Sequence, residues 1–144
     1  MSSKEFDLTN NSKNEVIGKE GIYVIQKHYA SHLHYDLRLE ENGVLKSWAL
    51  PKEPPSKPGI KRLAVQTEDH PLGYENFEGI IPEGLYGAGR VEIWDRGHYK
   101  EIEADDQKKV IEIFGEKLKG KYVLLRLKQK GDKNWLFFKK KEEK

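Results

Sequence analysis

Short segments in which hydrophobic and polar residues alternate make up most of the chain after residue 20. A period of two residues is typical of β-strands with one buried face, whereas an amphipathic helix repeats every 3.6 residues. Glycine, asparagine and proline separate the segments and mark turns between them. The pattern predicts about eight strands, over Ile22–Ile25, Leu33–Leu39, Val44–Leu50, Leu63–Thr67, Arg90–Trp94, Val110–Phe114, Tyr122–Leu127 and Trp135–Phe138.

Two of the connections carry clear signals. Asn42 and Gly43 fit a tight hairpin turn, because both residue types tolerate positive φ. The proline-rich segment 51–59 cannot form a central strand or a helix interior, since proline lacks a backbone donor, so we expect a surface loop. Many short strands without long helices between them predict a mainly β protein, an antiparallel barrel or sandwich.

The turn signals in the second half of the chain are weaker. We expect Arg96-Gly97 to end a strand, and a helical turn only near Ala104–Lys109. The glycine-rich segment Ile81–Gly89 suggests a loop that cradles phosphate. However, a strand pattern follows it rather than a helix, and it lacks the Lys-Ser or Lys-Thr pair of such loops. We therefore interpret it as a tight connection that lets the chain pass close to a neighbour.

Length and composition limit the class of protein. The 144 residues suffice for one domain, which we place at residues 21–140 after a flexible polar tail over residues 1–20. The absence of cysteine excludes disulfides and thiolate metal sites. No apolar run approaches ~18 residues, so we expect a cytoplasmic protein without membrane contact. A net charge of +2 argues against coating of nucleic acid by bulk charge but permits a local basic surface.

The densest cluster of functional side chains lies between Gln26 and Leu39. Residues of equal parity share one face of a strand, so His34, Asp36 and Arg38 should lie together on one side. Their odd-numbered apolar neighbours, from Leu33 to Leu39, should face the core. The even-numbered face is thus a candidate working surface.

Histidine and aspartate two residues apart on one face can share a metal ion. His28 would join His34 and Asp36 if the chain bends at Ala30-Ser31. Two imidazoles and one carboxylate leave coordination positions open for water and substrate, as a catalytic site requires. Mixed nitrogen and oxygen ligands suit Mn²⁺ or Zn²⁺ better than Mg²⁺ or Ca²⁺.

Arg38, one step further on the same face, would offer a planar fork to a phosphate beside that metal. The alternative is an amphipathic edge strand whose polar residues merely face water. His32 shares the even parity but falls near the expected bend, so we interpret it as a surface residue or a neighbour of the ligands rather than a ligand.

A second cluster follows the strand that ends near Thr67. His70 could donate to a phosphoryl oxygen or protonate a leaving group, Tyr74 could add a hydroxyl donor, and Glu68 could orient His70 or a water. The alternative is a plain turn in which His70 has no role. Lys52 and Arg62 could each steer an anion, although solvation at the surface is the better explanation for a lone basic residue.

Several ordered motifs together resemble the 3′-phosphoesterase domain of bacterial DNA ligase D and its stand-alone archaeal relatives. The resemblance runs from about Tyr23 to Phe138. Its motifs are His28-x5-His34-x-Asp36-x-Arg38, Lys46-Ser47-Trp48-Ala49-x-Pro51-Lys52, Glu68-Asp69-His70-Pro71-x-x-Tyr74, Phe77-Glu78-Gly79-x-Ile81-Pro82-Glu83-Gly84-x-Tyr86-Gly87-x-Gly89, Trp94-Asp95-Arg96-Gly97 and Gly115 to Gly120.

The resemblance implies a compact antiparallel β-barrel enzyme with short helical turns that uses Mn²⁺, or Zn²⁺ or Co²⁺ in its place. It would remove 3′-terminal ribonucleosides from primer strands as a phosphodiesterase, and 3′-phosphates as a phosphomonoesterase, during DNA repair and end joining. Carried onto this sequence, His28, His34 and Asp36 would bind the metal. The catalytic set would add Arg38, His70 and Tyr74 on the phosphate, with Gln26, Lys52, Arg62 and Glu68 in support.

The resemblance also implies the partners. We expect a monomer that acts on the 3′ end of a DNA primer-template, alongside a separately encoded ligase and polymerase. Two other hypotheses remain open from the residues alone. One is a non-catalytic barrel that binds nucleic-acid ends, and the other is a metal-dependent barrel that acts on a phosphorylated metabolite. Open-sided metal ligands favour catalysis, because binding alone requires only basic and aromatic residues.

Overall fold

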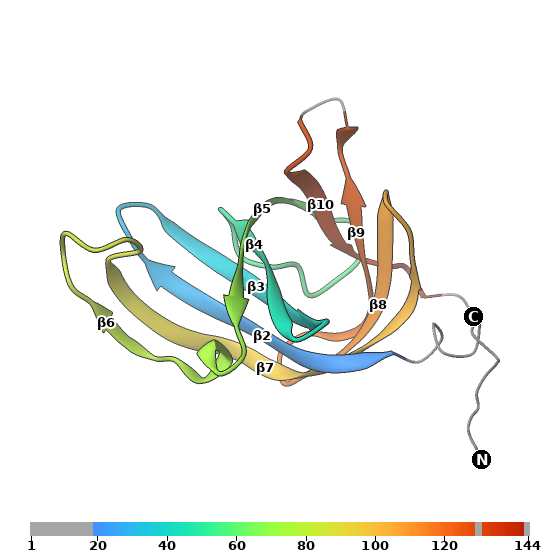
Figure 1. The fold of residues 1–144 in the computed structure, drawn as a ribbon. Coiled ribbons are helices and arrows are strands. Elements are labelled where there is room, and N and C mark those ends of the chain that lie inside the picture. Colours follow the sequence, from blue (N-terminus) through green and yellow to red (C-terminus); the bar gives the residue numbers. More distant parts are fainter. Residues whose placement is uncertain (1–18, 129–130, 143–144) are drawn as a thin grey trace, which may run out of the picture.

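The computed structural model describes residues 19–128 and 131–142, and almost every element within these ranges is a β-strand (Figure 1). The expected flexible tail over residues 1–20 lies almost wholly outside the described residues. Within them, no helix is long and apolar enough to cross a membrane. The elements are β2 (Glu20–Tyr29), β3 (Leu33–Glu41), β4 (Val44–Leu50), β5 (Lys61–Pro71), η1 (a 3₁₀ helix, Tyr74–Asn76), β6 (Gly79–Ile81), β7 (Gly89–Ala104), β8 (Lys108–Gly115), β9 (Lys119–Arg126) and β10 (Asn134–Lys139).

The strands form one antiparallel sheet that closes on itself. Their order is β2-β3-β4-β5-β10-β9-β8-β7-β6, and β2 also pairs with β7. This last pairing closes eight of the described strands into a barrel, while β6 lies outside the ring and pairs with the start of β7. Closure removes the exposed edges that an open sheet would leave. The predicted antiparallel β-barrel is therefore confirmed.

Strand β7 is longer than the sequence pattern predicts. It runs for 16 residues and passes through Arg96-Gly97, where we expected a strand to end. Its first residues pair with β6, and from Gly97 onward it pairs with β8. The prediction was wrong because Gly97 serves close approach rather than a turn. A Cβ atom at this position would collide with the carbonyl oxygen of Phe114 on β8.

The connections that begin and end β4 are as predicted. Asn42 and Gly43 have φ values of 55° and 83°, the pair of positive angles that a tight hairpin between β3 and β4 needs. Segment 51–59 forms the loop between β4 and β5, although Pro54 and Pro55 within it are buried. The Tyr122 hydroxyl donates to the Pro55 carbonyl at 2.8 Å and ties this loop to the barrel.

The helical turn expected near Ala104–Lys109 is absent from this described segment, which is a hairpin between β7 and β8. Asp105 Oδ1 accepts hydrogen bonds from the backbone N–H groups of Gln107 (2.8 Å) and Lys108 (3.0 Å). An aspartate that bonds its own following backbone in this way favours a turn over a helix. A helical turn forms instead at η1.

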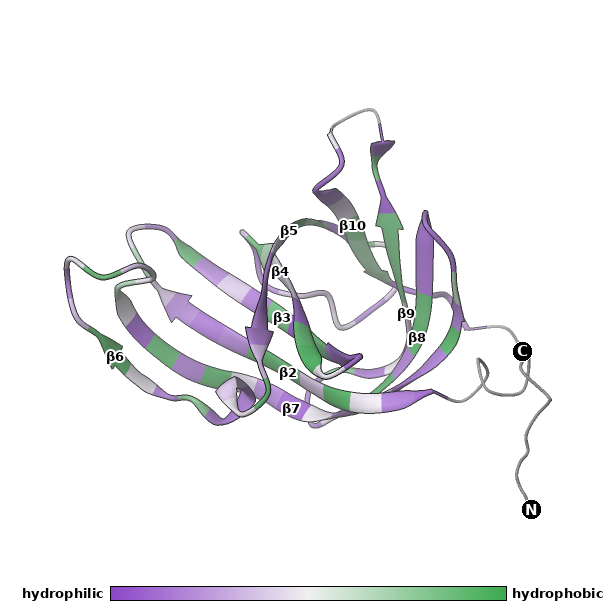
Figure 2. Cartoon of the chain, viewed as in Figure 1, coloured by the Kyte–Doolittle hydropathy of each residue, from purple (hydrophilic) through white to green (hydrophobic). Residues whose placement is uncertain are grey.

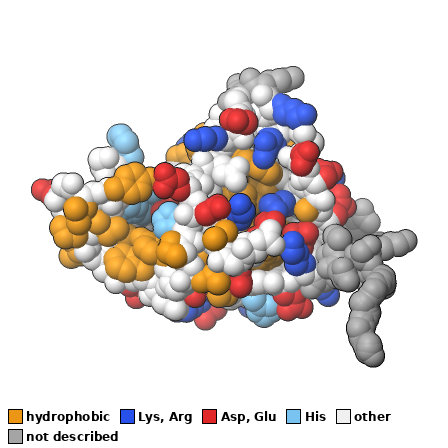
Figure 3. Space-filling view, viewed as in Figure 1, with side chains coloured by type: hydrophobic (Ala, Val, Ile, Leu, Met, Phe, Trp, Pro, Cys, Tyr) orange, Lys and Arg blue, Asp and Glu red, His pale blue; other side chains and the backbone are white. Residues whose placement is uncertain are grey.

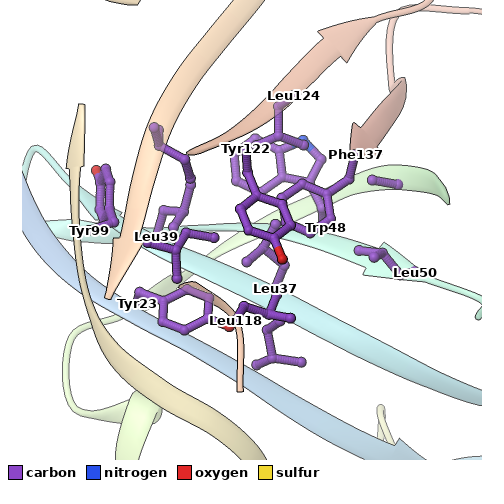
Figure 4. Close-up of a cluster of buried hydrophobic side chains, with 14 of the residues drawn as sticks. Tyr23, Leu37, Leu39, Trp48, Leu50, Tyr99, Leu118, Tyr122, Leu124 and Phe137 are labelled. Carbon is purple, nitrogen blue, oxygen red and sulfur yellow. The ribbon is translucent and has the colours of Figure 1, made fainter. Parts of the chain in front are cut away.

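The hydrophobic core fills the inside of the barrel, and every strand of the ring contributes to it (Figure 4). Hydrophobic and polar residues alternate along the strands, as the sequence pattern predicts (Figure 2). Aromatic rings supply much of the volume. Trp48 and Trp135 pack edge to face with centroids 5.8 Å apart, and Tyr122 stacks on Phe137 at 5.0 Å.

A buried carboxylate on β7 fastens the connection between β8 and β9 to the barrel. Asp95 accepts hydrogen bonds from the backbone N–H groups of Glu116 (2.8 Å), Lys117 (2.9 Å) and Leu118 (2.9 Å). The Tyr23 hydroxyl donates to it at 2.7 Å. Because Asp95 is only 3% exposed, these bonds replace the water that its charge has lost. The Trp94–Gly97 motif therefore has a structural role at Asp95.

Replacing this carboxylate should destabilise the protein. Asp95→Ala leaves backbone donors without their partner, so we expect the free energy of unfolding to fall by about 3 kcal/mol in urea denaturation. Tyr23→Phe removes a single hydrogen bond and should cost about 1 kcal/mol. Equal free energies of unfolding for Asp95→Ala and Tyr23→Phe would contradict this account.

Candidate metal and anion site

The candidate site lies on the outer face of the barrel wall formed by β2, β3 and β4. On β3, Leu37 and Leu39 are 0% and 1% exposed and face the core, so Asp36 and Arg38 point to the opposite side. The division of faces predicted from parity is confirmed for these residues. Leu33 departs from it, since it lies at the start of the strand and is 44% exposed.

Two later segments of the chain cover this outer face. The Gln26 side-chain amide donates to the carbonyls of Tyr74 (2.8 Å) and Phe77 (3.2 Å), and His28 donates to the carbonyl of Gly87 (2.8 Å). A pocket of about 340 Å³ remains between wall and cover. Figure 3 shows histidine surface between hydrophobic side chains at the end of the molecule that carries β6. The lining of the pocket includes all six residues predicted as catalytic: His28, His34, Asp36, Arg38, His70 and Tyr74.

The hairpin between β2 and β3 brings the three predicted metal ligands together. The chain reverses over residues 30–32, so His28 pairs directly with His34, and Gln26 pairs with Asp36. The bend expected at Ala30-Ser31 is therefore present. Side chains directly opposite each other on one face lie close enough to share a ligand.

The ligand atoms of this triad converge on one point. His28 Nδ1 lies 3.2 Å from His34 Nε2 and 3.7 Å from Asp36 Oδ2, and His34 Nε2 lies 3.3 Å from the same oxygen. All three atoms fall within 4.8 Å of one another. His28 and Asp36 are buried, whereas His34 is half-buried at the pocket wall.

Each imidazole uses its other nitrogen to bond a backbone carbonyl. His28 Nε2 lies 2.8 Å from the Gly87 oxygen, and His34 Nδ1 lies 3.1 Å from the His32 oxygen. Carbonyls only accept, so these nitrogens carry the protons and the facing nitrogens of neutral rings present lone pairs. Two lone pairs beside the carboxylate of Asp36 fit a divalent metal ion, which would offset their mutual repulsion.

Electrostatics keep the carboxylate of the triad ionised. Burial raises the pKa of Asp36, but the hydrogen bonds that His28 and His34 donate to it when their imidazoles are protonated, together with the charge of Arg38, outweigh burial. The net effect holds the Asp36 pKa well below its usual range. The hydrogen bond to Asp36 in turn raises the pKa of His34. Asp36 is therefore available to a cation at neutral pH.

Arg38 is a buried cation with a fixed orientation. Its Nε donates to Gln26 Oε1 (2.6 Å) and its Nη1 to Ser47 Oγ (2.8 Å), while Nη2 lies 3.6 Å from Asp36 Oδ2. Burial lowers the pKa of Arg38, and Asp36, Tyr74 and Tyr86 act in the opposite direction. The guanidinium is 4% exposed yet lines the pocket, so it offers a preorganised partner for an anion.

His70 and Tyr74 form the wall of the pocket beside Arg38. Their ring centroids lie 4.8 Å apart, and the Arg38 Cζ lies 4.9 Å from the Tyr74 ring. His70 Nδ1 lies 3.2 Å from Arg38 Nη1 and 3.1 Å from the Glu68 carbonyl oxygen. Burial and the charge of Arg38 lower the pKa of His70, which keeps its ring neutral at neutral pH. Both contacts use Nδ1 and leave Nε2 available to a ligand.

The predicted supporting residues divide into two groups. Gln26 is 0% exposed and joins Arg38 to the covering segment, so it lies next to the site without lining the pocket. Glu68 contacts His70 through its backbone carbonyl, with its side chain exposed. Lys52 is exposed in the proline loop, and Arg62 Nε donates to the Glu53 carbonyl at 2.8 Å. Neither basic residue is in the described pocket lining, and their role in steering an anion stays a prediction.

Two neighbours of the site, Ser47 and Gly87, were not predicted as site residues. Ser47 holds Arg38, and Gly87 supplies the carbonyl that orients His28. Ser47 shows a usable signal, because it pairs with Arg38 across β3 and β4 in the register that the Asn42-Gly43 turn sets. Gly87 has no such signal, since its contact with His28 spans 59 residues.

The fold and site together define a small antiparallel β-barrel with a candidate metal centre next to a preformed anion site. Residues 26–126 match the family described as the DNA ligase D 3′-phosphoesterase domain. The chain belongs to this family, as its motifs led us to expect. The expected likeness to stand-alone archaeal members stays a prediction.

Three relatives illustrate the similarity. The multifunctional non-homologous end joining protein LigD of Pseudomonas aeruginosa is 50% identical over 128 residues, which cover 83% of this chain and 15% of that protein. Two proteins of the same name are also similar. The one from Mycobacterium bovis is 44% identical over 133 residues, which cover 90% of this chain and 17% of that protein. The one from Mycolicibacterium smegmatis is 44% identical over 138 residues, which cover 88% of this chain and 18% of that protein. The chain thus spans less than a fifth of the length of these relatives.

The triad predicts binding of one divalent ion. Titration with Mn²⁺, followed by the electron paramagnetic resonance signal of the free ion, should show one site per chain. His34→Ala removes a ligand and should weaken binding by at least about tenfold. His32→Ala is the matched control, because it removes an exposed imidazole from the same hairpin and should leave the affinity unchanged. Equal affinities of the His34→Ala variant and the unaltered protein would rule out the triad.

Proposed function

We propose that the chain is a metal-dependent phosphoesterase that processes the 3′ ends of DNA strands during repair and end joining. It removes a 3′-terminal ribonucleoside as a phosphodiesterase, leaving a 3′-phosphate, and removes that phosphate as a phosphomonoesterase. Family membership supports this class of reaction. The observation that carries the proposal is the 3.6 Å contact between Arg38 and Asp36, which joins the anion site to the candidate metal ligands in one pocket.

The chemistry requires that negative charge on the phosphate be offset as it develops. His28, His34 and Asp36 would hold Mn²⁺, which when bound acts as a Lewis acid on a phosphate oxygen. Arg38 is already desolvated and oriented through Nε and Nη1, so its Nη2 can donate to a phosphate oxygen without reorganising during the reaction. The carboxylate of Asp36 stays ionised beside it and balances its charge until substrate enters.

His70 and Tyr74 complete the phosphate site. A neutral His70 can act as a general base that accepts a proton at Nε2, because its lowered pKa keeps the ring unprotonated at neutral pH. Tyr74 lies against both His70 and Arg38 and so limits where the phosphate can lie. A barrel that only binds nucleic-acid ends would have no need for a triad of converging ligands behind this site.

A primer-template that ends in one ribonucleotide tests the proposed activity. With Mn²⁺ the protein should shorten the labelled primer and leave first a 3′-phosphate and then a 3′-hydroxyl. His34→Ala and Arg38→Lys should each reduce the rate by at least about a hundredfold, because the first removes a metal ligand and the second removes the guanidinium that Gln26 and Ser47 hold in place. Arg90→Lys changes an exposed arginine outside the pocket lining and is the matched control. No shortening, or shortening unaffected by both substitutions, would overturn the proposal.

Gln26 should act as a positioning residue for Arg38. Gln26→Ala removes the acceptor of Arg38 Nε and the two donors that hold the covering segment, so we expect kcat/KM to fall by about tenfold. Mn²⁺ affinity should stay unchanged, since the hydrogen bonds of the Gln26 side chain go to Arg38, Tyr74 and Phe77 and not to a ligand of the triad. Gln66→Ala, which removes an acceptor of Trp135 elsewhere in the barrel, serves as the control. A loss of Mn²⁺ affinity equal to the loss of activity would contradict this role.

A further inference from the structure

The connection between β6 and β7 places an exposed aromatic ring at the mouth of the pocket. Tyr86 lines the pocket and is nevertheless 88% exposed. Among the described residues it is the most exposed of the large hydrophobic side chains. Tyr86 belongs to the motif from Phe77 to Gly89, for which we predicted a tight connection and no side-chain role.

The backbone around Tyr86 is held in place. The carbonyls of Gly87 and Ala88 lie 2.8 Å and 3.3 Å from His28 Nε2. The N–H of Ala88 donates to the Leu85 carbonyl at 3.2 Å, and Gly84 and Gly87 adopt positive φ values of 91° and 76°. The ring is thus presented to solvent on a fixed turn that is bonded to a candidate metal ligand.

The ring also shares its pocket with the anion site. Tyr86, Arg38 and His28 all line this pocket. A phosphate bound at Arg38 would therefore bring a neighbouring nucleoside to this ring. Exposed apolar side chains beside a pocket commonly mark a binding surface, and hydrophobic side chains border the histidine surface in Figure 3.

We propose that Tyr86 stacks on the base of the 3′-terminal nucleotide while Arg38 holds the phosphate. This inference rests on the proposed 3′-end-processing function and adds a residue that positions the substrate. A terminal base is suited to such a contact, because one of its faces is not covered by a neighbouring base. Stacking on an aromatic ring tolerates every base, so Tyr86 contributes affinity without sequence preference.

The test compares two primers with four proteins. One primer ends in an ordinary ribonucleotide and the other in a ribose that lacks its base. Affinity is measured without turnover, by fluorescence anisotropy in the absence of Mn²⁺, and KM and kcat are measured with Mn²⁺. Tyr86→Ala should weaken binding and raise KM about tenfold for the ordinary primer. On the primer without the terminal base, Tyr86→Ala should have the same affinity and KM as the unaltered protein. Tyr86→Trp should retain full affinity for the ordinary primer.

The fourth protein, Leu85→Ala, is the matched control, because it removes an exposed apolar side chain from the same turn outside the pocket lining. It should leave both affinities unchanged. Equal effects of Tyr86→Ala on the two primers, or no effect on either, would overturn the stacking inference. The anisotropy measurement tests stacking even if neither primer is shortened. Absence of shortening by the unaltered protein would overturn the proposed function instead.

Discussion

The pairing register of β2 and β3 is the constraint on which the candidate site depends. It sets His28 opposite His34 and Gln26 opposite Asp36 on one face, and places Ile25 and Leu37 together in the core on the other. A slip of one residue would move every side chain of a strand to the opposite face. Burial of the apolar face thus fixes the register, and the register brings the three ligands together.

A buried polar site on the outside of a barrel needs its own cover. Arg38 and Asp36 lose water to the segments that follow β5 and β6, and Gln26 and His28 bond the backbone of these segments. Desolvation of Arg38 is offset by Gln26, Ser47 and Asp36 rather than by solvent. The site is therefore preorganised, because the same bonds that hold the cover also orient the groups that would meet a phosphate.

Local patterns predicted the parts of this structure that depend on local sequence. Alternation gave the faces of β3, and positive-φ residue types gave the hairpin after Glu41. The passage of β7 through Gly97 was not predictable, because this glycine is required by contact with Phe114 on another strand. Two hydrogen bonds also depend on how separate segments pack. His28 donates to the Gly87 carbonyl, and Arg62 donates to the Glu53 carbonyl.

Anomalous diffraction from crystals soaked in Mn²⁺ would show whether the triad binds a metal ion. We expect one strong peak in the pocket, bonded to His28 Nδ1, His34 Nε2 and the Asp36 carboxylate. His28 should keep its bond to the Gly87 carbonyl in that crystal. A pocket without a peak, or a Mn²⁺ ion bound elsewhere while the three side chains stay as they are, would contradict the account.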